Sequence, residues 1–343
     1  MPSLPALDIK TNINRSPHIV ILGAGASKAA FPKADAKGKA VPVMCELIEY
    51  LNLGPILKSH NLYCGDADFE SFYDDLVSSG KYPELVKEIE ARVQEYFSRL
   101  SLPERATIYD YLVLSLREKD LIASFNWDPF LALAWHRNSR AVKLPKIVHL
   151  HGNVELAACL ECRVKDFKGN ICQKCKKPLL PTPLLYPVKQ KNYSAHPFIE
   201  AEWNELRHFL KHNYFLTIFG YAAPETDVEA RKLLLNAWKD NPTFELAQIE
   251  IIDIKSKAKL TKTWKEFFCR DHYGISKSIW NSYLFHYPRR SCEAFAMATL
   301  QLSPWKDNPF PRTTSLSKLQ KWARLPWSEE TKGKLAGAPF AYS

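Results

Sequence analysis

Residues 18–27 read His18-Ile19-Val20-Ile21-Leu22-Gly23-Ala24-Gly25-Ala26-Ser27, an apolar run that ends abruptly in a glycine-rich turn. A short and wholly apolar run is typical of a strand that is buried on both faces. The turn is followed by Lys28-Ala29-Ala30, which favours a helix. This order of strand, turn and helix predicts the first unit of a parallel α/β sheet.

Further apolar runs of similar length follow along the chain, separated by stretches with helical spacing. A parallel sheet that is covered on both faces requires this alternation. We therefore predict an α/β fold with a Rossmann-like, doubly wound parallel sheet. Further strands are expected at 121–125, 147–150, 214–219, 249–254 and 283–287.

A long segment separates the first two predicted strands. Its apolar residues recur at three- and four-residue spacing, which predicts helices at 44–51, 68–78 and 83–99. The segment is longer than a simple crossover needs, so we interpret about 44–118 as an inserted helical layer that covers the site or contacts a partner. Other helices are expected at 107–116, 197–212, 227–238 and 291–301.

Four cysteines form two closely spaced pairs, Cys159-x2-Cys162 and Cys172-x2-Cys175. Two thiolate pairs suit the tetrahedral soft-ligand site that structural zinc prefers. The surrounding module, 154–190, is too short to be held by apolar burial, so metal binding would supply folding energy. A redox pair is the alternative, but it does not explain two pairs. We expect each remaining cysteine to be a buried small hydrophobe: Cys45, Cys64, Cys269 and Cys292.

The predicted organisation is a core in two parts, 15–153 and 191–302, on either side of the module at 154–190. Residues 303–343 are rich in Pro, Lys, Ser and Trp and form a C-terminal arm that wraps the domain or docks on a neighbour. The chain has 343 residues, a net charge of +10 and a composition typical of a globular protein. It carries no membrane-spanning apolar run and no secretion signal, so we expect a cytoplasmic protein.

Polar residues follow the second and third predicted strands at their carboxyl ends. Asn126 and Asp128 follow the second strand, and His151 follows the third. Ligands of open α/β sheets bind at this edge, where the turn 23–27 also lies. The turn could offer amides and the Ser27 hydroxyl to a phosphate, or serve only tight packing. Asp128 could instead cap a helix, and Gly152 is expected to keep the His151 ring accessible.

Together, the turn 23–27, Asn126-x-Asp128, His151-Gly152 and the four-cysteine unit resemble the sirtuin family. Gly220 and Tyr221 begin a stretch, 220–227, that is similar to an element of sirtuin-like bacterial proteins. The segments that bind acyl-lysine in the deacylases of the family are replaced here by other residues. The resemblance is therefore to the NAD-cleaving half, and it is closest to the sirtuin-like NAD hydrolases of bacterial antiphage defence.

This resemblance implies an NAD+ hydrolase that releases nicotinamide and ADP-ribose. Asn126 would hold the ribose or the attacking water, and His151 would act as a general base with an ordinary pKa near 6.5. Asp128 would bind the nicotinamide amide, and Asp253 the adenosine ribose. Ser27 and the loop amides would hold the pyrophosphate. The residues implied in NAD+ binding are Gly23, Ala24, Gly25, Ala26, Ser27, Asp128, Gly220, Tyr221 and Asp253.

The resemblance also implies an effector that is activated through a partner or an infection signal. We expect a homo-oligomer, and a hexameric ATPase of the DNA-translocase type is a candidate partner. Two alternatives remain open. One is an NAD-dependent protein-lysine deacylase. The other is a basic zinc-ribbon subunit that binds nucleic acid or an ATPase through Arg163, Lys165, Lys168, Lys174, Lys176 and Lys177.

Overall fold

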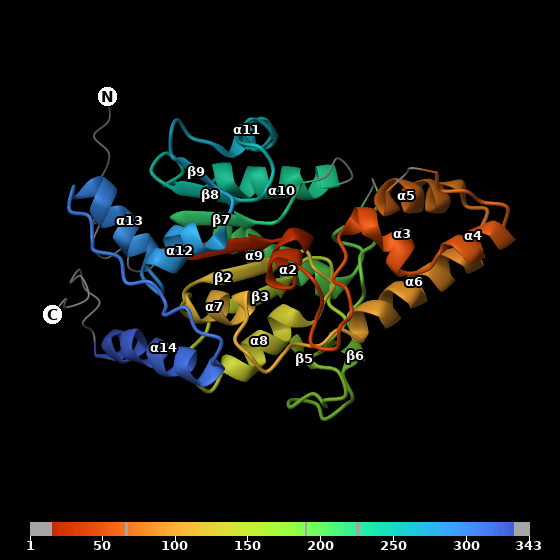
Figure 1. The fold of residues 1–343 in the computed structure, drawn as a ribbon, viewed down its shortest axis with the longest axis horizontal. Helices are drawn as coiled ribbons and strands as arrows, with labels where there is room; N and C mark the ends of the chain where they lie inside the picture. Colours follow the sequence, from red (N-terminus) through yellow and green to blue (C-terminus); the bar gives the residue numbers. More distant parts are fainter. Residues whose placement is uncertain (1–15, 66–67, 189–190, 224–226, 333–343) are drawn as a thin grey trace.

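A six-stranded parallel sheet forms the centre of the computed structural model, which describes residues 16–65, 68–188, 191–223 and 227–332. The sheet order is β3-β2-β1-β7-β8-β9, which can be followed from one edge to the other in Figure 1. This confirms the predicted Rossmann-like α/β fold. The strands are β1 (His18–Leu22), β2 (Leu121–Ser124), β3 (Lys146–His149), β7 (Phe215–Phe219), β8 (Gln248–Ile252) and β9 (Tyr273–Ser276).

The strand order reverses beside β1. From β1 the chain builds outward through β2 to β3, and it then returns to the other side of β1 with β7. In the parallel register, Leu22 lies beside Ser124 of β2 and Phe219 of β7. The loops that follow these three strands therefore leave the sheet at the same level, and a reversal of this kind opens a crevice for a ligand.

Both faces of the sheet are buried. Alternate residues of β1 enter two separate apolar clusters, with Val20 in one and Ile19 in the other. Burial on both faces explains why the sequence of β1 is apolar throughout rather than alternating. The first cluster includes residues of α7 (Ile108–Leu114), α8 (Phe130–Asn138) and α14 (Leu316–Thr331), and the second includes residues of α9 (Pro197–Leu210), α10 (Val228–Lys239) and α11 (Lys257–Trp264).

The predicted helical insertion between β1 and β2 is confirmed. After α2 (Ala24–Ala30) come the 3-10 turn η1 (Met44–Glu46), α3 (Leu47–Tyr50), α4 (Gly54–Ser59), α5 (Phe69–Ser79) and α6 (Pro83–Ser98). Figure 1 shows α3 to α6 projecting beyond one end of the sheet. Phe69 and Ile89 belong to the apolar cluster that also contains Val20, so the projection is continuous with the main core.

The four-cysteine module forms a small sheet of its own. The antiparallel strands β4 (Leu156–Cys159), β5 (Val164–Phe167) and β6 (Leu180–Pro181) lie in the order β5-β4-β6. Cys159, Cys172 and Leu179 are buried in a separate small cluster. The module therefore has almost no apolar core, as its length predicts.

The sixth strand was predicted in the wrong place. Residues 283–286 form a short helix, α12 (Tyr283–His286), because the Ser282 hydroxyl accepts a hydrogen bond from the Phe285 amide at 3.2 Å and caps it. The sixth strand is β9, which pairs with β8 alone at the sheet edge. Its four residues are only half-buried, so it lacks the apolar run that marks a central strand. The neighbouring elements are η3 (Lys265–Phe267), η4 (Ile279–Asn281) and α13 (Ser291–Leu300).

The described part of the C-terminal arm packs on its own domain. Leu319 and Ala323 of α14 are buried in the main core. The buried side chains of Arg289 and Arg290 pair with Glu330 and Glu329 of α14, at 2.5 and 2.7 Å. Residues 303–332 therefore wrap the domain, and 333–343 lie outside the described residues. Within the described ranges, no helix combines the length and the apolar character needed to cross a membrane.

The remaining cysteines differ from one another. Cys292 is buried, as predicted, and lies in a cluster with Phe215. The prediction is wrong for Cys45, which is exposed, and Cys64 and Cys269 are only partly buried. Cys45 lies on the short turn η1, where the side chain faces a surface hollow instead of the core.

A small group of polar side chains is buried at the start of β1. Nε2 of His18 lies 2.8 Å from the Thr217 hydroxyl, which donates to the Glu250 carboxylate at 3.4 Å. The other carboxylate oxygen of Glu250 accepts from the Tyr283 amide at 3.1 Å. Burial lowers the pKa of His18 to about 3 and raises the pKa of Glu250 to about 7. Burial thus favours the neutral form of both groups.

We predict that Glu250→Gln stabilises the protein at high pH. A glutamine can still accept from the Tyr283 amide, and it carries no charge. Because burial raises the pKa of Glu250 in the folded state from 4.5 to about 7, its ionisation destabilises the fold as pH rises through this interval. The full cost above the upper value is about 3 kcal/mol. Urea unfolding should show the variant more stable than wild type at pH 8, with the difference vanishing near pH 4.5.

The matched control is Glu245→Gln, which changes an exposed glutamate just before β8. We expect its stability to differ little from that of wild type, because the side chain is exposed. If wild type were more stable than Glu250→Gln at pH 8, this result would contradict the assignment of Glu250 as a buried, destabilising carboxylate.

Candidate functional site

A cavity of about 650 Å³ opens where the strand order reverses. Its lining comes from the loops that follow β1, β2, β3, β7 and β8, all at the carboxyl ends of the strands. Pro42 and the helical insertion close another side, the insertion through Met44, Leu47 and Phe97. The volume lies within the range of small-molecule sites, roughly 300–1,000 Å³.

The structure brings nearly all the predicted site residues into this one cavity. Ala26 is the exception, since its side chain is buried in the main core instead. Ala26 was predicted as part of the binding turn, and its place in the core follows from its position inside α2. The predicted residues that line the cavity are Gly23, Ala24, Gly25, Ser27, Asn126, Asp128, His151, Gly220, Tyr221 and Asp253.

The glycines of the first turn allow two backbones to touch. A Cβ on Gly25 would lie 2.8 Å from the Gly220 Cα, and Gly220 itself has a φ of +63°. The amides of Gly23 and Gly25 donate to the carbonyls of Phe219 and Gly220 at 3.1 and 3.0 Å. These two amides are therefore engaged within the protein, and a phosphate contact through the loop amides stays a prediction. The tight-packing alternative explains the glycines.

Asn126 is held in one orientation. Its Nδ2 donates to the Gly23 carbonyl at 3.0 Å and to the Ser27 hydroxyl at 2.9 Å, and it lies 3.3 Å from the Tyr109 hydroxyl. Within the described ranges, no side chain or amide donates to its Oδ1. The amide group is thus anchored to the protein through its nitrogen, and its oxygen is free to accept a hydrogen bond.

Ser27 and Asp128 form a short buried hydrogen bond. The Ser27 hydroxyl donates to Oδ2 of Asp128 at 2.6 Å, and Oδ1 accepts from the Phe130 amide at 3.2 Å. Asp128 therefore contacts the start of α8, as the capping alternative predicts, while it also lines the cavity. Burial raises the pKa of Asp128 to about 6. The Ser27 hydroxyl is engaged in this contact, so the predicted role of Ser27 in holding a pyrophosphate is not supported.

His151 lies in the cavity wall with its ring packed against aromatic side chains. The ring meets Phe125 edge-on, with centroids 4.8 Å apart, and Nε2 lies 3.3 Å from the Tyr193 hydroxyl. Gly152 does not serve to expose this ring. Its φ is +77°, and a Cβ would lie 1.8 Å from the Pro183 carbonyl oxygen, so this position needs glycine to admit the neighbouring chain.

The protonation of His151 also differs from the prediction. Burial lowers its pKa to about 3, against the ordinary value near 6.5 that we expected. The imidazole is therefore neutral at physiological pH. It can accept a hydrogen bond, but it is a weak base.

Several charged residues in the cavity were not predicted. Lys191 and Asp227 form an ion pair whose side chains are 5% and 6% exposed, and the Tyr221 hydroxyl donates to Asp227 at 3.1 Å. Lys255 and Lys259 line the side next to Asp253. The spacing Lys255-x3-Lys259 after a predicted strand could have indicated the last two. Lys191 belongs to no motif, and only the fold brings it here.

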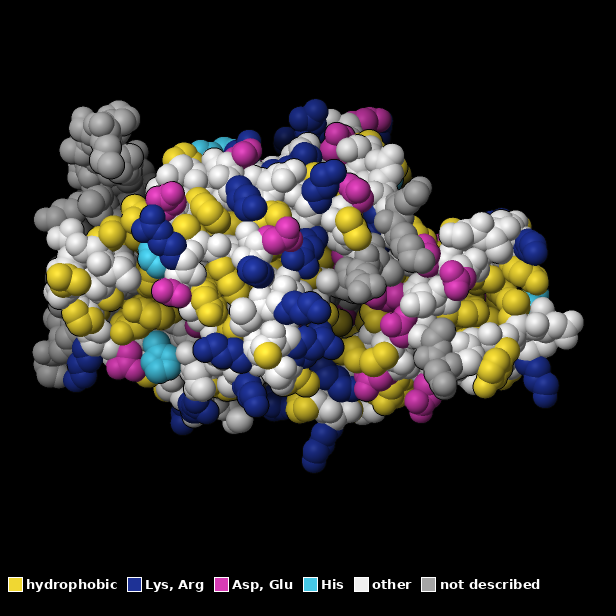
Figure 2. Space-filling view, turned by 90° about the horizontal axis from the view of Figure 1, so that it is seen from above, with side chains coloured by type: hydrophobic (Ala, Val, Ile, Leu, Met, Phe, Trp, Pro, Cys, Tyr) yellow, Lys and Arg dark blue, Asp and Glu magenta, His cyan; other side chains and the backbone are white. Residues whose placement is uncertain are grey.

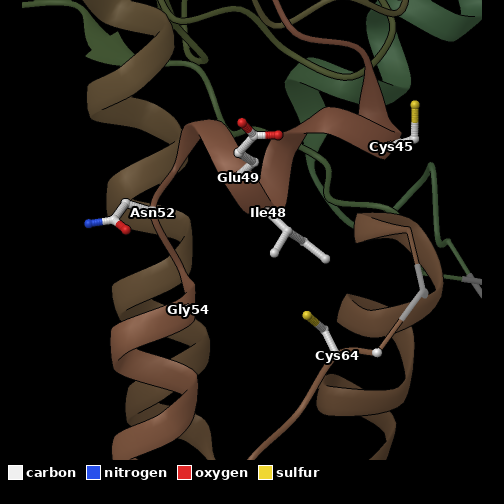
Figure 3. Close-up of a pocket in the computed structure, with 7 residues that line it drawn as sticks. Cys45, Ile48, Glu49, Asn52, Gly54 and Cys64 are labelled. Atoms are coloured by element: carbon white, nitrogen blue, oxygen red, sulfur yellow. The ribbon is translucent and has the colours of Figure 1, made fainter.

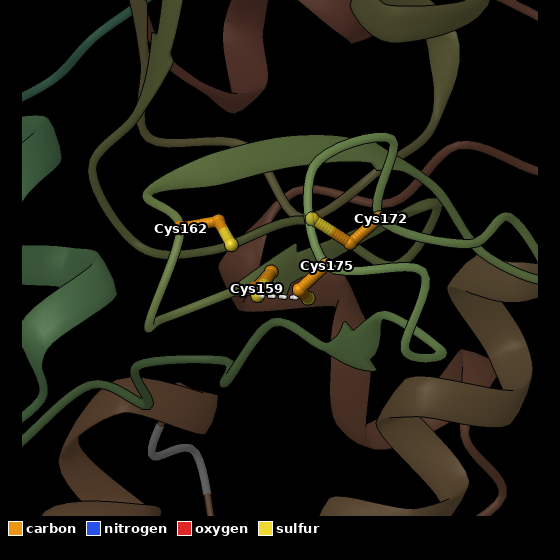
Figure 4. Close-up of side chains that lie close together, drawn as sticks. All are labelled: Cys159, Cys162, Cys172 and Cys175. Atoms are coloured by element: carbon orange, nitrogen blue, oxygen red, sulfur yellow. Dashed lines mark hydrogen bonds between the residues drawn. The ribbon is translucent and has the colours of Figure 1, made fainter.

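The four cysteines of the small module converge. Their sulphur atoms all lie within 4.8 Å of one another, and those of Cys159 and Cys175 are 3.6 Å apart (Figure 4). Such a cluster of four soft donors could hold a metal ion. The cysteines are not part of the cavity lining, so this cluster and the cavity are separate sites.

The basic residues of this module are partly neutralised. Lys165 pairs with Glu202 at 2.7 Å, and Lys177 pairs with Glu161 at 2.9 Å. Other cations are exposed elsewhere, on and just after α11: Lys257, Lys259, Lys262 and Lys265. Figure 2, which looks down on the side of the molecule where α10 and α11 lie, shows many Lys and Arg side chains across the middle of this face. Positive charge is therefore not concentrated on the cysteine module.

A second hollow, of about 470 Å³, lies entirely within the helical insertion. Its lining includes Cys45, Ile48, Glu49 and Cys64, and the Cys45 sulphur points away from Cys64 (Figure 3). It adjoins the larger cavity at Cys45, which lines both, but none of its own lining residues belongs to a loop that follows a strand of the main sheet. The larger cavity is therefore the candidate functional site.

No family model and no curated protein matches the chain. Among solved structures, a complex of Sir2 homologue mutants with 2'-O-acetyl ADP ribose has 14% identity and a TM-score of 0.41, covering 94% of this chain and 98% of that one. A Sir2 homologue mutant with ADP ribose has 14% identity and a TM-score of 0.39, with 95% and 98% covered. A Sir2 homologue in complex with NAD has 12% identity and a TM-score of 0.36, with 93% and 94% covered.

Proposed function

We propose that this chain is an NAD+ hydrolase that cleaves the bond between nicotinamide and ribose. The observation that supports the proposal is the convergence of Asn126, Asp128 and His151 in a single cavity with four residues of the first turn, Gly23, Ala24, Gly25 and Ser27. That cavity lies at the reversal of a doubly wound sheet, where dinucleotides bind. The products are nicotinamide and ADP-ribose.

In this proposal Asn126 orients the reacting groups. Its unpartnered Oδ1 accepts a hydrogen bond from a ribose hydroxyl or from the attacking water. The water oxygen forms the new bond to the anomeric carbon, and the electron pair of the broken bond goes to the ring nitrogen of nicotinamide. The proton of the water is released to solvent.

Asp128 accepts from the amide of nicotinamide. Its pKa of about 6 leaves most of the carboxyl ionised at neutral pH, and the Ser27 hydroxyl holds one of its oxygens in place. An ionised carboxylate also favours the positive charge that develops on the sugar.

His151 acts as a neutral acceptor in this site. Because burial holds its pKa near 3, it does not bring a second positive charge next to the developing cation. Nε2, which lies 3.3 Å from the Tyr193 hydroxyl, is proposed to accept a hydrogen bond from a ribose hydroxyl. This role replaces that of a strong general base.

The pyrophosphate is proposed to bind to lysines. The amides of Gly23 and Gly25 are used within the protein, whereas Lys255 and Lys259 line the cavity and pair with no carboxylate in the part of the chain that the structure describes. Asp253, whose Oδ1 accepts from the Lys255 amide at 2.9 Å, is proposed to contact the adenosine ribose next to them.

We propose zinc as the metal of the four-cysteine cluster. Four thiolates around a zinc ion lie about 3.8 Å from one another, because each bond is about 2.3 Å long and the geometry is tetrahedral. The sulphur atoms lie within 4.8 Å of one another, and those of Cys159 and Cys175 are 3.6 Å apart, so the cluster is close to this arrangement. The chain that leaves the module carries Pro183 against Gly152, and its Leu185 amide donates to the His151 carbonyl at 3.0 Å. The metal would thus help to hold His151.

The sequence resemblance also supports a proposal about the role of the protein in the cell. We propose an effector of antiphage defence that is activated through a partner or an infection signal and that works as a homo-oligomer. An ATPase of the hexameric DNA-translocase type is the proposed partner. Activity of the purified chain should then rise when the activating component is added.

Hydrolysis of NAD+ should depend on Asn126 and His151. We expect Asn126→Ala and His151→Ala each to slow nicotinamide release by at least about 100-fold, as loss of a positioned polar group does. The measurement is chromatography of NAD+, nicotinamide and ADP-ribose, with and without lysate of infected cells. The controls are Asn204→Ala and His208→Ala, which change exposed residues of α9 and should retain full activity.

The same assay separates the deacylase alternative. A hydrolase releases nicotinamide without an acyl-lysine peptide, whereas a deacylase releases it only when the peptide is present. The hydrolase proposal fails if both site variants retain wild-type activity or if release requires the peptide.

Metal content should depend on the four cysteines. We expect about one zinc per chain in the wild type, and a loss of most of it in Cys172→Ser and Cys175→Ser, because three thiolates bind zinc far more weakly than four. Elemental analysis together with the melting temperature measures this. Cys45→Ser alters an exposed cysteine outside the cluster and should retain the metal. Full zinc content in both cluster variants would rule out a four-cysteine site.

A further inference from the structure

We propose that Tyr109 is a positioning residue that sets the orientation of the Asn126 amide. Tyr109 lies on α7 within the helical insertion and is 1% exposed. Its hydroxyl lies 2.6 Å from the Ser27 hydroxyl and 3.3 Å from Nδ2 of Asn126. The functional meaning of this contact depends on the proposed NAD+ hydrolysis, but the contact itself does not.

The direction of the hydrogen bonds follows from counting protons. The ionised carboxylate of Asp128 can only accept hydrogen bonds, so the Ser27 hydroxyl donates its single proton to Asp128. The Ser27 oxygen must then accept from the Tyr109 hydroxyl. The Tyr109 oxygen in turn can accept from Nδ2 of Asn126. Burial and the nearby Asp128 raise the pKa of Tyr109 well above its usual value, so it keeps the proton that it donates.

This order leaves only one orientation for Asn126. If the amide were flipped, its oxygen would face the Gly23 carbonyl at about the present distance of 3.0 Å, and two acceptors would repel. It would also face Ser27, whose proton is already given to Asp128. Tyr109 completes this arrangement because its hydroxyl donates to the Ser27 oxygen. The Ser27 hydroxyl is then oriented to donate its own proton to Asp128.

The position of Tyr109 is fixed by the helix that carries it. Asp110 caps α7 by accepting from the Thr107 amide at 2.7 Å, and it also accepts from Arg137 and Asn138 of α8. The Tyr109 ring packs against both Phe31 and Phe130, whose rings also contact each other. Its hydroxyl can therefore not follow Asn126 if that side chain rotates, which is what a positioning residue requires.

Tyr111 offers a matched control on the same helix. Two residues apart, the side chains of Tyr109 and Tyr111 point in nearly opposite directions. The Tyr111 hydroxyl donates to the C-terminal arm, at 2.7 Å from the Thr313 carbonyl, and accepts from the Thr313 amide at 2.9 Å. Tyr111→Phe therefore removes a buried hydroxyl from α7 without touching Asn126.

The first experiment compares the kinetics of Tyr109→Phe and Tyr111→Phe in the full chain. We expect Tyr109→Phe to lower kcat by about tenfold with KM changed less than about twofold, the effect of losing one hydrogen bond to a reacting group. Tyr111→Phe should retain kcat. In an Asn126→Ala background, Tyr109→Phe should have no further effect, since the two residues act as one unit. Equal losses in both backgrounds, or a wild-type kcat in Tyr109→Phe, overturn the proposal.

The second experiment needs no activity. The side-chain NH2 resonances of Asn126, assigned with Asn126→Asp, are recorded by nitrogen-15 NMR in the two tyrosine variants. We expect them to shift in Tyr109→Phe and to stay in place in Tyr111→Phe. Unshifted resonances in Tyr109→Phe overturn the proposal even in an active enzyme. A shift in a chain that neither binds nor cleaves NAD+ upholds the orienting contact and rejects the hydrolase function instead.

Discussion

The contact between the turns after β1 and β7 is the constraint on which the rest of the site depends. The Gly25 amide donates to the Gly220 carbonyl, and neither residue leaves room for a Cβ. These two strands are neighbours at the point where the sheet order reverses. Because the two backbones touch there, the polar residues that follow β2 and β3 face a crevice of defined width. The first turn therefore shapes the cavity, and other groups supply its chemistry.

Burial controls the charge in this cavity. It keeps the His151 imidazole neutral and raises the pKa of Asp128 towards neutrality. The buried charges of Lys191 and Asp227 form an ion pair with each other. Where polar groups are buried, each needs a partner of the right polarity. Asn126 has partners for its nitrogen and none for its oxygen within the described residues, so the oxygen is the group available to a ligand. The cysteine module contributes at a distance, through the chain that packs on Gly152.

Local pattern was sufficient for the central strands and for the two cysteine pairs. Strands such as β1 are apolar on both sides, and close cysteine pairs place their ligands within a few residues. Local pattern failed for β9, because this edge strand is only half-buried and has no continuous apolar run. It also failed for the Tyr283–His286 helix, because a short apolar run has the same pattern in a strand and in a helix. It also gave no sign of the Asp128 carboxylate that Ser27 contacts, because a serine at the end of a glycine turn has the same local pattern whether it faces a phosphate or a buried carboxylate.

The sequence by itself determined the α/β class, the position of the inserted helices and which strand ends carry Asn126, Asp128 and His151, because these follow from periodicity within a few residues. Only the tertiary structure decided how those groups behave. The pKa of His151, the use of the loop amides by Phe219 and Gly220, and the presence of Tyr109 beside Asn126 all arise from residues far apart in the chain. Burial and hydrogen-bond partners are properties of the packed fold, and no local pattern contains them.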